Sequence, residues 1–187
     1  MTTKIRCAWC EKDDLYRDYH DNEWGNPVYE DHKLFEFLVL ETFQAGLSWH
    51  IILKKRDNFR VAFDNFDYKQ IVHYKEAKVQ ELLQDAGIIR NQLKIRGTIS
   101  NAIAFIKIQE EFGSFSKYIW NFTGGKPIEN NRETIKDIPA TTPLSDVISK
   151  DLKKRGFKFV GSTVVYAHMQ ATGIVNDHVK NCWKIQE

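Results

Sequence analysis

The feature that most constrains the fold is an acidic residue in the middle of a long apolar stretch. Residues 34–49 read LFEFLVLETFQAGLSW and have the periodicity of one helix that breaks or bends near Gly46. At helical spacing Glu41 falls on the face that packs against the core. A buried carboxylate without a partner is strongly unfavourable or takes up a proton. Glu41 therefore requires either a fixed partner in the core or a ligand that supplies one.

Aromatic residues gather close to this helix in the sequence. Four of them lie within the first fifty positions: Trp9, Tyr19, Trp24 and Trp49. Residues 19–25, YHDNEWG, place polar and titratable groups between two large aromatic side chains, and a loop of this kind usually lines a site. Any one of these aromatic residues could simply pack beneath the loop. Together with Glu41, they favour a pocket with aromatic walls.

Composition and charge are those of a compact globular chain. The hydrophobic content is 42% over 187 residues, which is enough for a sizeable core. Lys and Arg number 27 against 25 for Asp and Glu, so the net charge does not by itself indicate a nucleic-acid binder. The sequence contains neither a secretory signal pattern nor an apolar run long enough to span a membrane. We expect one compact, soluble, cytoplasmic unit over residues 1–187, with a monomer as the simplest state.

The rest of the chain reads mainly as helices joined by short loops. Amphipathic or apolar patterns predict helices over residues 75–85, 92–113, 144–155 and 162–171. The apolar residues of the long second helix that we expect in the core are Leu93, Ile95, Ile99, Ala102, Ile103 and Ile106. Residues 126–142 are polar and read as a surface loop. Asn176 or Asp177 can cap a last short helix that bears His178 and Cys182.

A tight turn between two predicted helices is the second informative motif. Residues 85–91 read DAGIIRN and join the helix before them to the long helix that follows. Such a helix-hairpin-helix unit presents backbone N–H groups beside a helix N-terminus, where a phosphate oxygen is well accommodated. The candidate DNA contacts are Gly87, Ile88, Arg90 and Asn91. A plain helix pair has the same pattern, because short connections are common in helix bundles.

The three cysteines lie near the two ends of the chain and cannot form a closed disulfide framework. On a helix, His178 and Cys182 would leave the same face, which is half of a tetrahedral zinc site. The N-terminal segment offers the other half. The set that we predict for one structural zinc ion is Cys7, His20, His178 and Cys182. Cys10 is an alternative to Cys7, His168 is a weaker alternative, and the two pairs could be unrelated.

Several short sequence blocks of unusual composition are distributed along nearly the whole chain. They are CAW at 7–9, YHDNEWG at 19–25, LETFQAGLSW at 40–49, ILKKR at 52–56, DAGIIRN at 85–91, LKKRGFKFVGST at 152–163 and VNDH at 175–178. Together they resemble the bacterial 3-methyladenine DNA glycosylase I family. Two positions depart from the pattern of that family: Thr42 replaces a glycine found in many relatives, and Gln92 replaces a basic residue after the hairpin.

The resemblance implies an all-α fold of the helix-hairpin-helix superfamily with a zinc site that ties the termini together. The expected organisation is a core over residues 33–155, with its hairpin at about 85–91, and a zinc-clasped lobe from residues 1–32 and 156–187. The implied activity is hydrolysis of the N-glycosidic bond of 3-methyladenine in alkylated double-stranded DNA. The base would be flipped out, released and replaced by an abasic site, without a lyase step.

The resemblance also implies roles for individual residues. Glu41 would be the catalytic carboxylate and would hydrogen-bond the methylated base, while Tyr19 and Trp49 would pack around it and Trp9 would close the pocket. The zinc ligands would be Cys7, His20, His178 and Cys182. A cationic base suits such a site, because cation–π attraction contributes about 2 kcal/mol when desolvated and a carboxylate accepts a charge-assisted hydrogen bond.

Two other functions compete with this interpretation. A zinc hydrolase needs a coordination position left open to water, which four protein ligands would close. A non-catalytic, zinc-stabilised helix-hairpin-helix module that only binds DNA would use the hairpin and the metal equally well. Such a module does not explain a buried Glu41 among aromatic residues.

Overall fold

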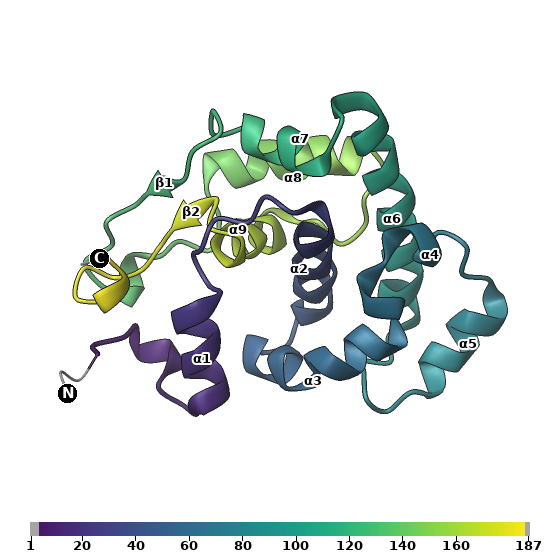
Figure 1. Ribbon diagram of the computed structural model, residues 1–187, viewed down its shortest axis with the longest axis horizontal. Coiled ribbons are helices and arrows are strands. Elements are labelled where there is room, and N and C mark those ends of the chain that lie inside the picture. Colours follow the sequence, from purple (N-terminus) through teal and green to yellow (C-terminus); the bar gives the residue numbers. More distant parts are fainter. Residues whose placement is uncertain (1–3, 186–187) are drawn as a thin grey trace.

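The computed structural model describes residues 4–185, whose regular structure is mostly helical (Figure 1). The α-helices are α1 (Asp14–Asn22), α2 (Asp31–Gln44), α3 (Trp49–Ala62), α4 (Tyr68–Ile71), α5 (Glu76–Gln84), α6 (Gln92–Phe112), α7 (Phe115–Asn121), α8 (Pro143–Lys154) and α9 (Ser162–Ala171). Two short strands, β1 (Ile128–Glu129) and β2 (Val175–Asn176), are the extended elements of the described part. The predicted all-α class is confirmed.

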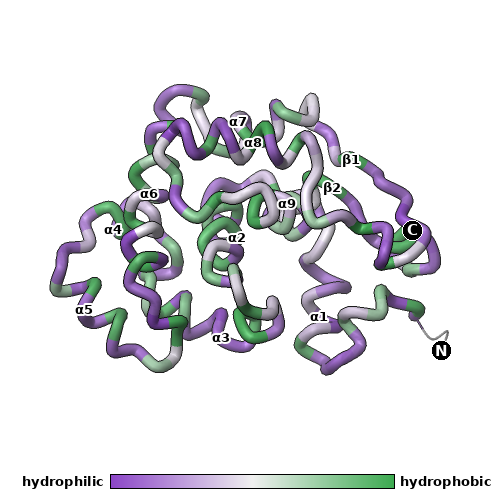
Figure 2. The backbone as a smooth tube through the Cα atoms, turned by 180° about the vertical axis from the view of Figure 1, so that it is seen from behind, coloured by the Kyte–Doolittle hydropathy of each residue, from purple (hydrophilic) through white to green (hydrophobic). Residues whose placement is uncertain are grey.

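Helix α2 lies at the centre of the molecule and is surrounded by helices α3, α6, α7 and α9 (Figure 1). Every residue from Leu34 to Phe43 is buried. In Figure 2 the hydrophobic residues of α2 are coloured green. The expected break near Gly46 is confirmed: α2 ends at Gln44, and Gly46 has a φ of 85°. Glycine adopts this left-handed conformation without steric cost. Because of the break, Trp49 begins a separate helix, α3, instead of continuing α2.

Helix α6 follows the hairpin, and its apolar pattern predicts the face that packs on the core only in part. The predicted core residues that are buried or half-buried are Ile95, Ile99, Ala102 and Ile106. Leu93 and Ile103 are instead 68% and 43% exposed. Lys94 is buried, and its Nζ donates hydrogen bonds to the carbonyl oxygens of Phe43 (3.0 Å) and Ala45 (2.7 Å). The last carbonyls of a helix lack partners within the helix, so this ammonium group closes the C-terminus of α2.

The segment expected to form a last short helix is extended, so that prediction is wrong. Strand β2 pairs in parallel with β1, with Ile128 opposite Val175, and an isolated bridge continues the pairing between Arg132 and Val179. Backbone groups of Ile174, Asn176 and Lys180 therefore bond across to the polar loop over residues 126–142. Cys182 bonds back to Val179 in a turn, and a single 3₁₀ turn, Trp183–Ile185, follows. This loop, which reads as a surface loop in the sequence, is tied to the C-terminal segment.

The N-terminal and C-terminal segments lie at the same end of the molecule (Figure 1). The backbone N–H of Trp183 donates to the carbonyl of Ile5 at 2.9 Å, which joins the two segments directly. Helix α9 packs on both α8 and α2, so the C-terminal segment also contacts the core. Within residues 4–185, no helix combines the length and the apolar character needed to cross a membrane.

The contact of Lys94 with the end of α2 can be tested by substitution. In Lys94→Met the carbonyls of Phe43 and Ala45 lose a charged donor, and we expect a loss of about 2 kcal/mol in the free energy of unfolding. Urea unfolding measures this loss. The matched control is Lys107→Met on the exposed side of the same helix, which should leave the stability unchanged. Equal stability of the two variants would show that the buried ammonium group does not hold the helix end.

Candidate functional site

A cavity of about 200 Å³ opens beside the middle of α2. This is roughly the volume of seven water molecules, which suits a ligand the size of a nucleobase. Its lining residues are Trp9, Tyr16, Tyr19, Trp24, Glu41, Gln44, Trp49, Ile138, Ala167 and Gln170. The structure thus brings together all four residues predicted to contact the base, from the N-terminal turn, α1, α2 and α3.

Glu41 lies on the wall of this cavity without a partner. Its side chain is 4% exposed, and its Oε2 makes no hydrogen bond with any of the described residues. Burial raises the pKa of Glu41 to about 8. The carboxyl group is therefore protonated at neutral pH unless something in the cavity favours its charge. Of the two explanations that the helix leaves open, a ligand is the one that fits.

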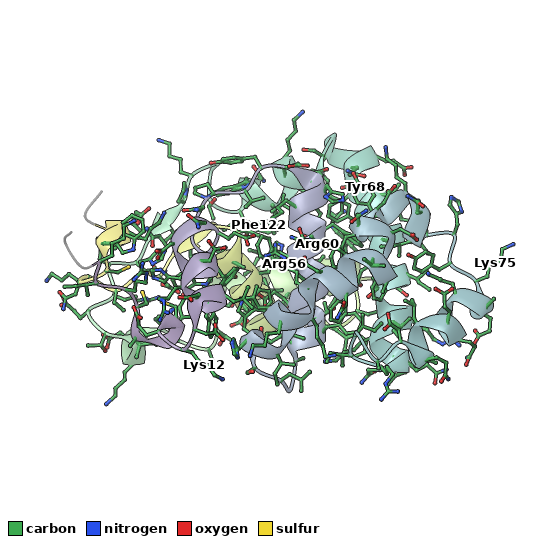
Figure 3. The ribbon with its side chains drawn as sticks, turned by 60° about the horizontal axis from the view of Figure 1, so that its bottom comes forward. Lys12, Arg56, Arg60, Tyr68, Lys75 and Phe122 are labelled. Carbon is green, nitrogen blue, oxygen red and sulfur yellow. The ribbon has the colours of Figure 1, made fainter. Side chains whose placement is uncertain are left out.

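A second buried glutamate on the same helix, Glu36, has fixed cationic partners. Glu36 is 3% exposed, but its carboxylate binds Arg56 Nε at 2.8 Å, Arg60 Nη2 at 2.8 Å and Lys33 Nζ at 3.0 Å. Figure 3 shows Arg56 and Arg60 close together on α3. Desolvation alone would raise the pKa of Glu36, yet the nearby cations, Arg56 first, lower it to about 2. The ion pairs thus explain Glu36, whereas nothing comparable neutralises Glu41.

The cavity walls are mostly aromatic faces and edges. The rings of Tyr19 and Trp49 lie 5.3 Å apart at 44°, and Trp9 meets Trp24 edge to face at 5.0 Å. The indole Nε1 of Trp49 is buried and has no acceptor among the described residues. Burial, with a smaller contribution from Glu41, raises the pKa of Tyr19, so its hydroxyl stays neutral. The wall therefore offers a flat ligand π faces, the unpaired carboxyl group of Glu41 and the unpaired donor of Trp49.

Helix α1, which carries Tyr19, is held against α3 at both ends. At its start, Asp13 accepts the backbone N–H of Tyr16 through Oδ1 and binds His50 Nε2 through Oδ2 at 2.6 Å. At its end, both carboxylate oxygens of Glu23 bind the guanidinium of Arg56, at 2.7 and 2.8 Å. Two carboxylate contacts thus fix the distance between the aromatic residues of α1 and Trp49 on α3.

The four residues predicted as metal ligands are buried and lie together. His178 Nδ1 is 3.6 Å from Cys7 Sγ and 3.5 Å from Cys182 Sγ, and His20 Nε2 is 3.4 Å from Cys182 Sγ. All four ligand atoms lie within 4.8 Å of one another. Bonds of about 2.0–2.3 Å at tetrahedral angles separate ligand atoms by roughly 3.3–3.8 Å. The group could therefore hold a metal ion.

The outer hydrogen bonds orient both histidines toward this group. His20 Nδ1 lies 2.8 Å from Asp21 Oδ1, and His178 Nε2 lies 3.1 Å from the carbonyl of Trp24. Each acceptor takes a ring N–H, so the other ring nitrogen keeps its lone pair for a metal. Asp21 is in turn held by Arg6, which donates from Nε and Nη2. These contacts are those expected around a metal site.

The two alternative ligands lie outside the group. Cys10 is buried, but its Sγ donates to the carbonyl of Cys7 at 3.1 Å. His168 Nε2 hydrogen-bonds the carbonyl of Leu34 at 3.0 Å, and burial lowers the pKa of His168 to about 4. Both side chains are therefore engaged in the core.

The predicted hairpin lies between α5 and α6. Gly87 donates its N–H to Asp85 Oδ1, and its carbonyl accepts from Lys55 Nζ at 3.1 Å, so the turn is anchored to α3. Ile88 is buried, whereas Arg90 and Asn91 are exposed. Asn91 caps α6, because its Oδ1 accepts the N–H of Lys94. The hairpin thus has an anchored apolar side and an exposed polar side.

Comparison with known proteins agrees with this geometry. The family model described as methyladenine glycosylase matches residues 9–185. The chain belongs to this family. One curated relative, DNA-3-methyladenine glycosylase 1 of Escherichia coli (strain K12), is 48% identical over 177 residues, which are 95% of each chain.

Solved structures of related proteins share the fold of this chain over nearly its whole length. A crystal structure of 3-methyladenine DNA glycosylase I has a TM-score of 0.93 at 48% identity and covers 96% of this chain and 98% of that chain. The enzyme of Staphylococcus aureus, in a structure that addresses 3-methyladenine recognition, has a TM-score of 0.92 at 35% identity, with coverage of 95% and 94%. The predicted glycosylase fold is confirmed.

Several members of the cavity wall are absent from the residues predicted to contact the base. Tyr16 lies three residues before Tyr19 on α1, and Gln44 lies three residues after Glu41 on α2, so helical periodicity could have found both. Ile138, Ala167 and Gln170 come from a loop and from α9, which only the tertiary packing brings to the cavity. Local sequence patterns carry no signal for these three.

The raised pKa of Glu41 predicts a specific dependence of stability on pH. Between the ordinary carboxyl pKa of 4.5 and the raised value of about 8, the folded state holds a proton that the unfolded state has released. The free energy of unfolding should therefore fall as the pH rises through this range, by up to about 1.4 kcal/mol per pH unit. Glu41→Gln has no titrating group at this position and lacks this dependence on pH.

The measurement is urea unfolding of wild type and Glu41→Gln at several pH values from 4.5 to 8. All other titrating groups are common to both proteins, so the difference isolates Glu41. We expect the stability of the variant relative to wild type to increase with pH. A constant difference across the range would mean that Glu41 titrates normally, and the cavity would then not hold an uncompensated carboxyl group.

Proposed function

We propose that the protein is a DNA glycosylase that hydrolyses the N-glycosidic bond of 3-methyladenine in alkylated DNA. It releases the free base and leaves an abasic site. The observation that carries this proposal is the buried Glu41, unpartnered on the wall of an aromatic cavity. The related enzymes named 3-methyladenine glycosylases support the same substrate.

The chemistry of the damaged base matches this cavity. Methylation at N3 leaves the adenine ring cationic in DNA and weakens its glycosidic bond before any enzyme acts. The faces of Tyr19 and Trp49 attract such a ring by cation–π interaction, worth about 2 kcal/mol when desolvated. Glu41 regains its charge beside the cation and accepts a hydrogen bond from the base, while Trp9 closes the wall. Undamaged adenine is neutral and gains neither contribution.

The same arrangement supports hydrolysis by water without a lyase step. Among the described residues, the cavity lining contains no lysine that could act as an amine nucleophile. Lys94, the lysine buried after the hairpin, is bound to two backbone carbonyls at the end of α2. A good leaving group needs only modest stabilisation, which the aromatic wall and Glu41 supply.

The hairpin is the proposed contact to double-stranded DNA. Its backbone N–H groups and the start of α6 would bind phosphate oxygens, with Gly87, Ile88, Arg90 and Asn91 as the contacting residues. The base would flip into the cavity, which costs least for a damaged nucleotide. We propose a monomer that works in the cytoplasm as one catalytic unit, with a core over residues 33–155 and a lobe from residues 1–32 and 156–187.

We also propose that Cys7, His20, His178 and Cys182 hold one structural zinc ion. Two thiolates and two imidazoles are a typical structural zinc set, and both histidines are oriented by outer acceptors. The ion would tie the two ends of the chain together. Four protein ligands leave no position for water, which argues against a zinc hydrolase. A module that only binds DNA would not need Glu41 among aromatic residues.

The experiment that tests the activity measures free bases released from methylated duplex DNA by wild type and Glu41→Gln. We expect wild type to release 3-methyladenine in preference to 7-methylguanine. Glu41→Gln should release 3-methyladenine at least about tenfold more slowly, because loss of a charged hydrogen bond costs about 1.5–3 kcal/mol.

The control for folding is the stability of the Glu41→Gln protein, which should not fall. If folded wild type releases no base yet binds duplex DNA, the non-catalytic module is the correct account. If the variant works at the wild-type rate, Glu41 has no part in the reaction.

Zinc can be tested with two matched cysteine variants. Cys182→Ser should lose the metal and several kcal/mol of stability, because metal binding contributes to folding. Cys10→Ser replaces an equally buried thiol outside the group and should keep the metal. Elemental analysis and thermal unfolding of the purified proteins give both readouts. A metal-free wild type, or a Cys182→Ser protein with full metal content, would contradict the assignment.

A further inference from the structure

A buried carboxylate behind the cavity organises one of its walls. Asp177 is fully buried, and its Oδ1 accepts hydrogen bonds from Asn130 Nδ2 at 2.8 Å and Arg132 Nε at 2.9 Å. Its Oδ2 accepts from Tyr166 Oη at 2.5 Å and from Gln170 Nε2 at 2.8 Å. All four partners donate, so both oxygens of Asp177 act as acceptors.

This network fixes the orientation of an amide that lines the cavity. Gln170 lies in the last turn of α9 and belongs to the cavity wall together with Glu41. Because Asp177 is an acceptor, Gln170 must turn its NH₂ group toward it, and its carbonyl Oε1 points to the other side. Among the described residues, Oε1 takes part in no hydrogen bond, so it is available to a ligand.

We propose that Gln170 is a specificity-determining residue, whose carbonyl oxygen is turned to the cavity by Asp177 and reads a hydrogen-bond donor on the base. This inference rests on the proposed function and names what the cavity selects beyond positive charge. With Glu41 it gives the wall two acceptors, which suit a base that carries its exocyclic amine on ring carbon 6, as adenine does. A guanine-type base carries a carbonyl oxygen at the corresponding ring position. This oxygen and Gln170 Oε1 are both acceptors, so neither would find a donor in the other.

The consequence is a preference for adenine-type over guanine-type methylated bases that depends on Gln170. A site whose polar group is left unpaired by the wrong ligand discriminates more strongly than an apolar wall does. Trp49 Nε1, an unpaired donor on the same wall, suits a ring nitrogen of the same base. Shape and cation–π attraction do not separate the two bases, because both are flat and methylated at N3.

The test compares the affinities of the full-length protein for free 3-methyladenine and free 3-methylguanine. Trp9, Trp24 and Trp49 line the cavity, so quenching of tryptophan fluorescence reports binding. Gln170→Met keeps the length of the side chain and removes its acceptor. We expect about tenfold weaker binding of 3-methyladenine, an unchanged affinity for 3-methylguanine, and therefore a loss of selectivity.

The matched control is Gln80→Met on α5, an exposed amide far along the chain from the cavity residues, which should leave both affinities unchanged. If Gln170 only supported Asp177 structurally, both bases would lose affinity together and the selectivity would stay as in wild type. That result would overturn the inference. Failure of wild type to bind 3-methyladenine would instead overturn the proposed function itself.

A second variant tests the role of Asp177. In Asp177→Asn the new amide NH₂ can donate to Gln170, which would reverse its side chain and turn its own NH₂ toward the cavity. We expect the selectivity to shift toward 3-methylguanine beyond the value for Gln170→Met. A folded Asp177→Asn protein with wild-type selectivity would overturn the mechanism. Because His178 is adjacent, thermal unfolding and metal content are measured first, and Gln170→Met decides the question if this variant does not fold.

Discussion

Two glutamates five residues apart on α2 are almost equally buried, and only one of them is neutralised by the protein. Glu36 is surrounded by the cationic groups of Lys33, Arg56 and Arg60, which hold it as a carboxylate. Glu41 meets aromatic rings and a cavity. An uncompensated buried charge costs far more than a single hydrogen bond returns, so the folded chain leaves Glu41 protonated until a ligand with positive charge arrives. The proposed preference for a cationic base follows from this difference.

The surrounding elements keep that cavity in shape. The break at Gly46 separates Trp49 from α2, and Lys94 closes the helix end on the near side of the break. Asp13 and Glu23 fix α1 on α3 from its two ends. Lys94, Asp13 and Glu23 lie outside the cavity lining, yet their contacts set the distance between aromatic surfaces that must match a flat ring.

The metal-ligand group and the cavity share a wall. Trp24 lines the cavity, and its ring lies 4.6 Å from the ring of His178 and 6.3 Å from that of His20. Its carbonyl also accepts the N–H of His178. Trp9 follows Cys7 by two residues and packs on Trp24. A metal ion in the group would therefore stabilise the aromatic wall as well as the chain ends.

Much of this arrangement could be predicted from the sequence, and the errors have physical reasons. A carboxylate in an apolar helix was enough to predict the burial of Glu41, and the few cysteines and histidines were enough to predict the metal-ligand group. A clear apolar pattern predicts the observed bounds of α9. The burial of Lys94 was missed because its ammonium group meets helix-end carbonyls that no local pattern reveals. The segment with His178 and Cys182 is not helical because strand β2 and the bridge at Val179 pair it with the loop over residues 126–142. Gln170 is not predicted because only tertiary packing brings it to the cavity.

The central claim is that Glu41 changes its protonation state when the ligand binds. Carbon-13 NMR of the side-chain carboxyl groups, followed as a function of pH with and without 3,9-dimethyladeninium, which keeps the positive charge that the base has in DNA, measures this directly, and Glu41→Gln identifies the signal. We expect Glu41 to have a pKa near 8 in the free protein and a clearly lower pKa in the complex, because a hydrogen-bonded ligand with positive charge favours the charged form. A signal that titrates near the ordinary value of 4.5 in the free protein, or that does not move on binding, would contradict it.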